Sequence, residues 1–174
     1  MTSLTINRFT IVNAVLFQAL WLSCVIGAGA LGLHWLAILA FGLLSAALFW
    51  SPVRGSDLTV AAIALVAGLA ADNLWAILGI LDFSNSALAP YWIGLLWFGM
   101  GLTINHSLSW FRDRRYLGPV IVGCFAPVTY FSGERFGAVS VPAIEPMLLV
   151  SLSWVAIFYM LSHIAIGRAG ASSG

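Results

Sequence analysis

Long apolar runs separated by short polar segments dominate the pattern of this chain. No charged residue occurs from position 9 to position 53, and this run is long enough for two membrane-spanning helices of about 20 residues each. The glycine-rich segment 27–32 favours a turn that divides the run in two. Polar segments at 51–57, 81–86 and 112–115 separate the apolar runs that follow. The pattern therefore predicts a bundle of membrane-spanning helices.

The predicted fold class is an all-α membrane protein, a single domain of six transmembrane helices over residues 1–168. The six helices are expected at about 9–28, 33–51, 57–81, 90–111, 118–137 and 146–166. Asp57 or Ser56 suits the N-cap of the third helix, because a short oxygen-bearing side chain accepts a bond from the free amides of the first turn. The tail 169–174 is small and polar and is expected to be disordered.

Composition supports a membrane protein, since 61% of the 174 residues are hydrophobic and 7% are charged, against about 25% charged in a soluble domain. The net charge of +1 excludes nucleic-acid binding through a clustered basic surface. The chain has seven arginines and no lysine, and the six-helix arrangement puts only Arg135 on one side of the membrane. The positive-inside rule then places both termini in the cytoplasm.

The third and fourth predicted helices each show an apolar stripe at helical spacing opposite small and polar residues. The third is expected to turn its stripe to lipid and Asp72 and Asn73 into the bundle. Its stripe consists of Ile63, Val66, Ala70, Leu74, Ile77 and Leu81. The fourth is expected to turn Asn105 and His106 inward. Its lipid-facing stripe is Ile93, Trp97, Met100, Ile104, Leu108 and Phe111.

An aspartate inside a membrane costs about 2.5–3.5 kcal/mol to insert, so Asp72 should be paired, solvated or protonated. Two interpretations stay open, a structural hydrogen-bond clamp between helices and a ligand or proton site. Its depth places Asp72 in an outer polar cluster, with Asn73, Trp75, Trp92, Glu134, Arg135 and Glu145 as the other candidates. Arg135 is expected to form a charge-assisted contact with a carboxylate of that side, above all with Glu145 or Asp72.

A second candidate cluster lies near the inner side and comprises Asn13, Gln18, Asn105 and His106. A two-histidine site with His163 is geometrically feasible, but no further ligand follows His106 at i+3 or i+4. No metal and no cofactor are therefore expected. The sequence contains no Walker loop, dinucleotide fingerprint or nucleophile elbow, so the catalytic residues, if any, are unknown. Trp21, Trp75 and Trp154 lie deep in their helices and either fill the core or line a cavity for an acyl chain or an apolar ring.

Several segments combine aromatic, amide and small residues in a recognisable way. They include Asn13 through Trp21, Ala71-Asp72-Asn73-Leu74-Trp75, Pro90-Tyr91-Trp92, Asn105-His106-Ser107-Leu108-Ser109-Trp110 and Ala126-Pro127 through Tyr130. These segments resemble the bacterial membrane proteins grouped as domain-of-unknown-function family 2878, over residues 10 to 165. The resemblance implies an uncharacterised multi-pass inner-membrane protein associated with fatty-acyl modification of phospholipids. It transfers no catalytic residue.

Three functions remain open from the sequence. The first is a protein that binds or handles a lipid or other apolar molecule, as an accessory to membrane-lipid modification. The second is an enzyme acting on a lipid head group through Asp72, Glu134 or Glu145 as acid or base. The third is a small proton-coupled transporter. The expected partners are membrane lipid and either a second copy of the chain or a membrane enzyme, and not nucleic acid.

Overall fold

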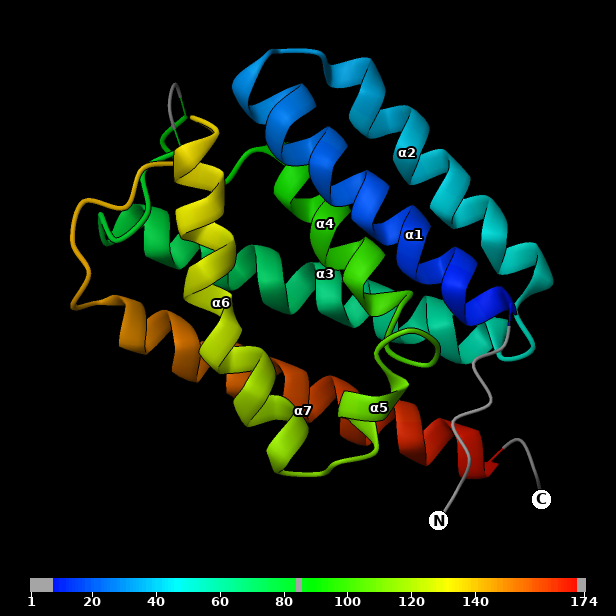
Figure 1. Ribbon diagram of the computed structural model, residues 1–174. Coiled ribbons are helices and arrows are strands. Elements are labelled where there is room, and N and C mark those ends of the chain that lie inside the picture. Colours follow the sequence, from blue (N-terminus) through cyan, green and yellow to red (C-terminus); the bar gives the residue numbers. More distant parts are fainter. Residues whose placement is uncertain (1–7, 84–85, 172–174) are drawn as a thin grey trace.

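The computed structural model describes residues 8–83 and 86–171, with side chains to Arg168, and this part of the chain is helical without strands (Figure 1). The elements in chain order are α1 (Arg8–Leu22), the π-helical η1 (Ser23–Ala30), α2 (His34–Ala46), the 3₁₀ turn η2 (Ala47–Trp50), α3 (Arg54–Ile77), α4 (Tyr91–Gly101), α5 (Ser109–Arg112), α6 (Leu117–Arg135) and α7 (Met147–Ala171). The helical fold class is confirmed. α7 runs on to Ala171, so the first part of the predicted tail is helical, and residues 172–174 lie outside the described part.

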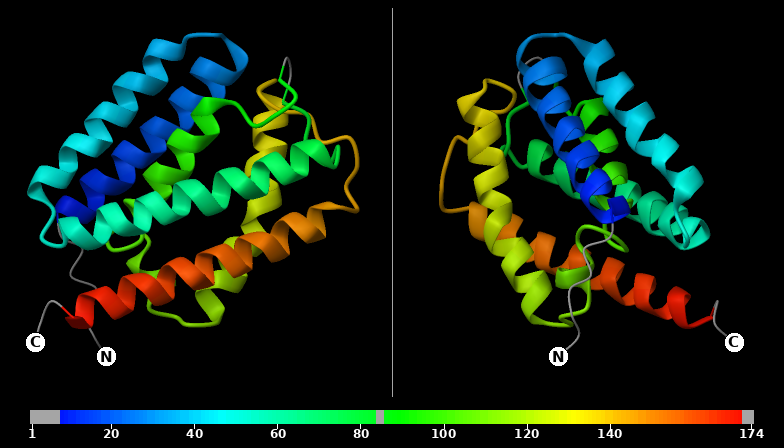
Figure 2. Two further views of the ribbon diagram at one scale, coloured as in Figure 1. Left: turned by 180° about the vertical axis from the view of Figure 1, so that it is seen from behind. Right: turned by 45° about the vertical axis from the view of Figure 1, so that its right-hand side comes forward.

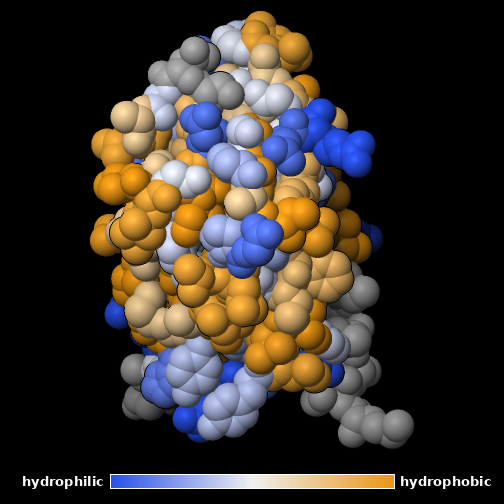
Figure 3. All heavy atoms as spheres, turned by 90° about the vertical axis from the view of Figure 1, so that its left-hand side faces the viewer, coloured by the Kyte–Doolittle hydropathy of each residue, from blue (hydrophilic) through white to orange (hydrophobic). Residues whose placement is uncertain are grey.

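The outer surface of the bundle is apolar enough for a membrane protein. Three helices are long and apolar enough to cross a membrane, namely Arg8–Ala30, Arg54–Ile77 and Met147–Arg168. Large apolar side chains such as Val66 and Ile77 are about 70% exposed, and their exposure suits lipid better than water. Figure 3 shows hydrophobic residues over most of one face, with the strongly hydrophilic ones mainly near its upper and lower ends. The count of six spans stays a prediction.

The bundle has two sides, one that contains α1, α2 and α4 and one that contains α6 and α7, and α3 joins them. α1 and α2 lie side by side, and α4 packs between α1 and α3, while α6 packs mainly on α7 (Figures 1 and 2). α3 contacts both α4 and α7 and so connects the two sides. The predicted lipid stripe of α3 is largely exposed, but Leu81 is buried in the loop beyond the helix.

The predicted lipid-facing stripe of the fourth helix is wrong. Ile93, Trp97, Met100 and Ile104 are all buried, because α4 is the central helix and has neighbours around its circumference. In lipid, an apolar side chain is equally suited to the core and to the surface, so the stripe alone does not distinguish them. Glycines give the close approach that this position requires, since a Cβ at Gly101 would lie 2.4 Å from Cα of Ala61 on α3.

The fourth helix is also interrupted. α4 ends at Gly101 after 11 residues, about 16 Å of helix at 1.5 Å per residue, where one helix over 90–111 was predicted. The chain then continues through hydrogen-bonded turns into α5. The buried Asn13 of α1 forms hydrogen bonds to this irregular segment. Its Nδ2 donates to the carbonyl of Leu102 (3.2 Å), and its Oδ1 accepts from Oγ of Ser107 (2.7 Å). Irregular backbone at membrane depth is stable where protein groups satisfy it in this way.

Two helices end at glycines with positive φ. Gly79 after α3 has φ 69°, and Gly137 after α6 has φ 80°, a backbone region that only glycine adopts readily. Each glycine amide donates to the carbonyl three residues back, and the following amide donates to the carbonyl five residues back. This capping ends α3 before the predicted residue 81 and fixes the end of α6. The two loops then join, because Asp82 and Ser140 exchange backbone hydrogen bonds of 2.9 and 2.7 Å.

The first helix is longer than predicted. Instead of turning at 28, the chain continues as the π-helical η1 to Ala30, and only Gly32 takes a positive φ of 68°. Gly29 serves close packing rather than a turn, since a Cβ there would lie 2.7 Å from Cβ of Ala138 and 3.2 Å from the ring of Trp92.

Candidate functional site: a cavity lined by aromatic side chains

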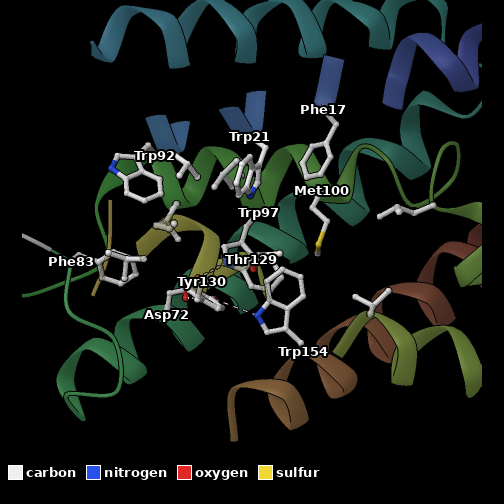
Figure 4. A pocket seen from close by; sticks show the side chains of 17 residues that line it. Phe17, Trp21, Asp72, Phe83, Trp92, Trp97, Met100, Thr129, Tyr130 and Trp154 are labelled. Atoms are coloured by element: carbon white, nitrogen blue, oxygen red, sulfur yellow. Dashed lines mark hydrogen bonds between the residues drawn. The ribbon is translucent and has the colours of Figure 1, made fainter. Parts of the chain in front are cut away.

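A cavity of about 200 Å³ lies where α4 and α6 face each other across the bundle (Figure 4). Its walls are apolar and come from α1, η1, α3, α4, α6, α7 and the adjoining loops. The lining residues are Phe17, Trp21, Val25, Asp72, Phe83, Trp92, Ile93, Leu96, Trp97, Met100, Leu108, Val122, Thr129, Tyr130, Gly133, Val139 and Trp154. The cavity exists because α6 packs on α7 and α4 on α3, so that aromatic side chains, and not a direct helix contact, bridge the space between them.

Asp72 is the one carboxylate of this wall, and it is 1% exposed. Its Oδ2 accepts a hydrogen bond from Nε1 of Trp97 (2.5 Å), and its Oδ1 accepts one from Oη of Tyr130 (2.5 Å). Nε1 of Trp154 donates in turn to Oη of Tyr130 (3.4 Å), and the rings of Trp97 and Trp154 lie 4.5 Å apart. The network therefore ties together α3, α4, α6 and α7, the helices that enclose the cavity (Figure 4).

Gly68 makes the position of Trp97 possible. It lies one helical turn before Asp72 on α3, and the indole ring packs directly on its Cα, because a Cβ there would lie 1.8 Å from Cδ2 of Trp97. The ring can thus lie flat on the helix while Nε1 reaches the carboxylate of Asp72. Sequence analysis described the face that carries Gly68 only as small and polar, and it missed Tyr130 and Trp97 as partners of Asp72.

The geometry restricts what this site can do. Each carboxylate oxygen of Asp72 already accepts a strong hydrogen bond, and the accessible wall of the cavity is apolar. The free surface of the cavity is thus apolar, and Asp72 contributes to it by holding the aromatic rings of Trp97 and Tyr130 in place.

The predicted outer cluster divides into separate parts. Asp72 and Trp92 line the aromatic cavity. Asn73 contacts the backbone, donating to the carbonyl of Leu69 (2.8 Å) and accepting from the amide of Ala89 (3.0 Å). Trp75 is buried in the core beside the cavity, and its Nε1 has no hydrogen-bond partner in the described part of the chain.

The remaining outer residues, Glu134, Arg135 and Glu145, line a different and open hollow of about 610 Å³ between α6 and the loop before α7. The three carboxylates proposed as catalytic acids therefore do not converge on one place. The carboxylate of Glu134 already has a backbone partner, since its Oε1 accepts a hydrogen bond from the amide of Val141 (2.8 Å).

The predicted ion pair of Arg135 is wrong. Over residues 8–83 and 86–168, the ion pairs within 4.0 Å are His106 with Asp57 and Arg112 with Asp113, and Arg135 is exposed outside both. The physical reason is that neutral donors, an indole and a phenol, stabilise Asp72 in place of a cation. A buried carboxylate needs hydrogen bonds, and these need not come from an opposite charge.

The inner cluster centres on a residue that sequence analysis left out. Asp57, in the first turn of α3, is fully buried, and its Oδ2 lies 2.9 Å from Nε2 of His106. Its Oδ1 accepts from Nδ2 of Asn105 (2.8 Å), and Ser51 Oγ donates to Oδ2. Arg112 extends the network by donating to Oδ1 of Asn105 (2.9 Å). The prediction that Asn105 and His106 lie together in a polar site is thus matched by these contacts.

Other members of the predicted inner cluster lie apart from it. Gln18 is exposed on α1, and His163 is exposed on α7. Asn13 is buried but serves the interruption after α4 instead. Within the described part of the chain, no three His, Cys, Asp or Glu side chains are grouped as a metal ion would need.

A signal for Asp57 was present in the sequence. In the predicted six-helix arrangement Asp57 lies at the start of the third helix and His106 near the end of the fourth, so both are expected on the same, inner side. The N-cap interpretation concealed the pairing, because it assigned the carboxylate to the amides of its own helix. The structure instead begins α3 at Arg54, and the carboxylate is used across the bundle.

Long apolar helices around an interior cavity define a helical membrane protein. A family model described as "Protein of unknown function (DUF2878)" matches residues 10–160, and the chain belongs to this family. The resemblance to domain-of-unknown-function family 2878 is therefore confirmed. Neither the curated proteins nor the solved structures contain a match.

Proposed function

We propose that this protein binds a small apolar molecule, or the apolar end of a lipid, in the aromatic cavity. The observation that carries the proposal is the cavity itself, about 200 Å³ with apolar, largely aromatic walls. Engineered apolar cavities of about 150 Å³ bind benzene, so this one has room for a ring or for the end of an acyl chain. A role as an accessory to membrane-lipid modification, with a membrane enzyme or a second copy as partner, belongs to the same proposal.

Energetics support an occupied cavity. Protein interiors are normally close-packed, and an empty apolar cavity costs stability because its wall atoms lack contacts. At about 24 cal/mol per Å³, a void of this size would cost roughly 5 kcal/mol, which an apolar ligand would largely recover. The Asp72 network holds the surrounding helices apart in a fixed geometry, so the cavity cannot collapse without breaking buried hydrogen bonds.

Native mass spectrometry of the detergent-purified protein, with variants that fill the cavity, tests this function. Val122 of α6 lines the cavity, whereas Val120 on the same helix is 47% exposed. We expect a retained apolar molecule in the wild type, at least a tenfold loss of it in Val122→Phe, and unchanged retention in Val120→Phe. No retained molecule in the wild type, or equal retention in both variants, would refute the proposal.

The membrane arrangement belongs to the proposal as well. We propose six crossings with both termini in the cytoplasm of a bacterial inner membrane. The arginine asymmetry supports it, and so does the placement of the start of α1 and the end of α7 toward the same end of the bundle (Figures 1 and 2). A reporter active only after export should be silent when fused after Arg168 and active when inserted near Ser86. The reverse pattern would overturn the topology.

A second candidate function, a proton-coupled transporter, is favoured by one specific observation. The interrupted α4 lies next to the buried Asp57–His106 pair, and interrupted helices beside ionisable groups are typical of transport sites. Potential-driven proton uptake into proteoliposomes, followed with an internal pH dye, should then occur in the wild type and fail in Asp57→Asn. Absence of uptake in the wild type would exclude this candidate.

A further inference from the structure

A second cavity, of about 230 Å³, lies at the opposite end of the bundle from the Glu134 hollow, where α5 and the chain leading into α6 meet the last turns of α7 (Figure 1). Its polar lining comes from Arg112, Arg115, Tyr159, Ser162 and His163. Among residues 8–83 and 86–168 no carboxylate lines it, and the nearby Asp113 is paired with Arg112 at 2.7 Å. The cavity thus combines two guanidinium groups, an imidazole and two hydroxyls with no negative charge of its own.

We propose that this cavity binds a phosphate group. Arg115 is the main ligand, since Arg112 is already engaged with Asn105 and Asp113. Arg115 uses one Nη2 contact, to Oη of Tyr159 at 3.3 Å, and its other N–H groups have no partner among the described residues. Guanidinium groups present a planar pair of donors that matches phosphate oxygens, and such charge-assisted bonds are stronger than neutral ones.

Ser162 provides independent support for a ligand. Its side chain is 3% exposed and lines the cavity, yet its Oγ has no hydrogen-bond partner in the part of the chain that the structure describes. A buried hydroxyl without a partner is costly, and native structures rarely keep one without a reason. This Oγ is shielded from the cavity as the side chain stands, and rotation about the Cα–Cβ bond would bring it to a phosphate oxygen bound beside Arg115.

Gly167 keeps the cavity open on the side of α7. A Cβ at this position would meet no atom within 4 Å, so the helix leaves free space where any other residue would place a side chain. Ile166 adds an apolar wall at the same level. The site therefore fits a phosphate group that carries an apolar attachment, as in an anionic phospholipid. A free phosphate anion has the same charged oxygens and would bind to the same side chains.

Two arms of one experiment distinguish these sources. The protein is placed in nanodiscs of phosphatidylcholine, and either phosphatidylglycerol in the disc or inorganic phosphate in the buffer is titrated while binding is followed by native mass spectrometry and thermal unfolding. The test variants are Arg115→Gln and Ser162→Ala, and the latter removes no hydrogen bond of the described fold. The matched control is Arg114→Gln, because Arg114 lies 3.5 Å over the ring of Trp110 and does not line the cavity.

We expect Arg115→Gln to weaken binding about tenfold and Ser162→Ala about threefold or more, from the usual strength of hydrogen bonds to charged groups. Arg114→Gln should bind as the wild type does. If phosphatidylglycerol binding weakens in this order of variants, the site belongs to a lipid head group. If only inorganic phosphate binds and weakens in this order, the site belongs to a free anion. Binding of neither, or equal weakening by Arg114→Gln and Arg115→Gln, would overturn the proposal.

Discussion

Replacing Gly68 by alanine is expected to break the network that encloses the aromatic cavity. The new Cβ would lie 1.8 Å from Cδ2 of Trp97, far inside van der Waals contact, so the indole ring has to move. Its Nε1 donates to Oδ2 of Asp72 over 2.5 Å, and this hydrogen bond is lost when the ring moves. A single methyl group thus removes both a packing contact and a donor to a buried carboxylate.

The magnitude follows from these two losses. Forcing an extra methyl into a packed core costs about 1–3 kcal/mol, and leaving a buried acceptor short of its donor costs about 1–3 kcal/mol more. Alanine also stabilises a helix relative to glycine by about 0.5–1 kcal/mol. The matched control Gly42→Ala in α2 receives the same gain without a clash, since a Cβ there meets nothing within 4 Å. The two variants should therefore differ by roughly 2–6 kcal/mol in unfolding free energy.

Thermal unfolding in detergent, followed by tryptophan fluorescence, measures the difference. For a chain of this size, 1 kcal/mol corresponds to roughly 2–4 °C, so Gly68→Ala should unfold at least about 4 °C below Gly42→Ala. The fluorescence of the folded Gly68→Ala protein should also change, because Trp97 and its neighbour Trp154 report on the cavity. Equal melting temperatures for the two variants would refute the packing of the Trp97 ring, which α4 carries, against Gly68 of α3.

Three further predictions concern the inner network and the outer surface. Replacing Asp57 or His106 singly by alanine should cost about 3–5 kcal/mol, because the partner stays buried without compensation, and a double-mutant cycle should show coupling through a double variant that costs less than the sum. Asn13→Leu should lower the unfolding free energy by about 1–3 kcal/mol, since the carbonyl of Leu102 loses its donor; an unchanged melting temperature would mean that the interruption does not depend on α1. Arg135→Gln should change stability by less than about 0.5 kcal/mol, because the side chain is exposed, and a loss of several kcal/mol would reinstate an ion pair there.

Helical class and most helix positions could be predicted because apolar run length depends on local sequence alone. The interruption after Gly101 could not, because residues 102–111 contain no charged residue, glycine or proline to mark a helix end, and the group that stabilises the break is Asn13, on another helix. The end of α3 had a local signal in Gly79, whose positive φ caps the helix. Sequence analysis treated the small residues of this helix only as packing positions, since in a membrane helix glycine serves both purposes.

In the candidate sites, too, the sequence indicated which residues are buried but not which residues of other helices contact them. Asp72 was singled out correctly as a buried acid, but its partners were sought among charges, and the bundle supplies Tyr130 and Trp97. Of Trp21, Trp75 and Trp154, for which a cavity was one of two interpretations, Trp21 and Trp154 line it, whereas Trp75 packs in the core beside it. Asp57 was missed because a carboxylate at a helix start has an ordinary local explanation, and only the packing of α3 against the turns after α4 brings it to His106.

The pairing of Asp57 with His106 also imposes an order on biosynthesis. The two residues lie 49 positions apart, so a ribosome adding about 5–20 residues per second delivers the histidine roughly 2–10 s after the aspartate. By the end of that interval the nascent chain contains three complete helices, and the carboxylate at the start of the third can bond to Ser51 but still lacks Asn105 and His106. The N-terminal half can therefore reach its final packing only after the interrupted helix has followed it into the membrane. A chain that stalls before residue 105 would keep this carboxylate without the amide and the imidazole that contact it in the folded protein.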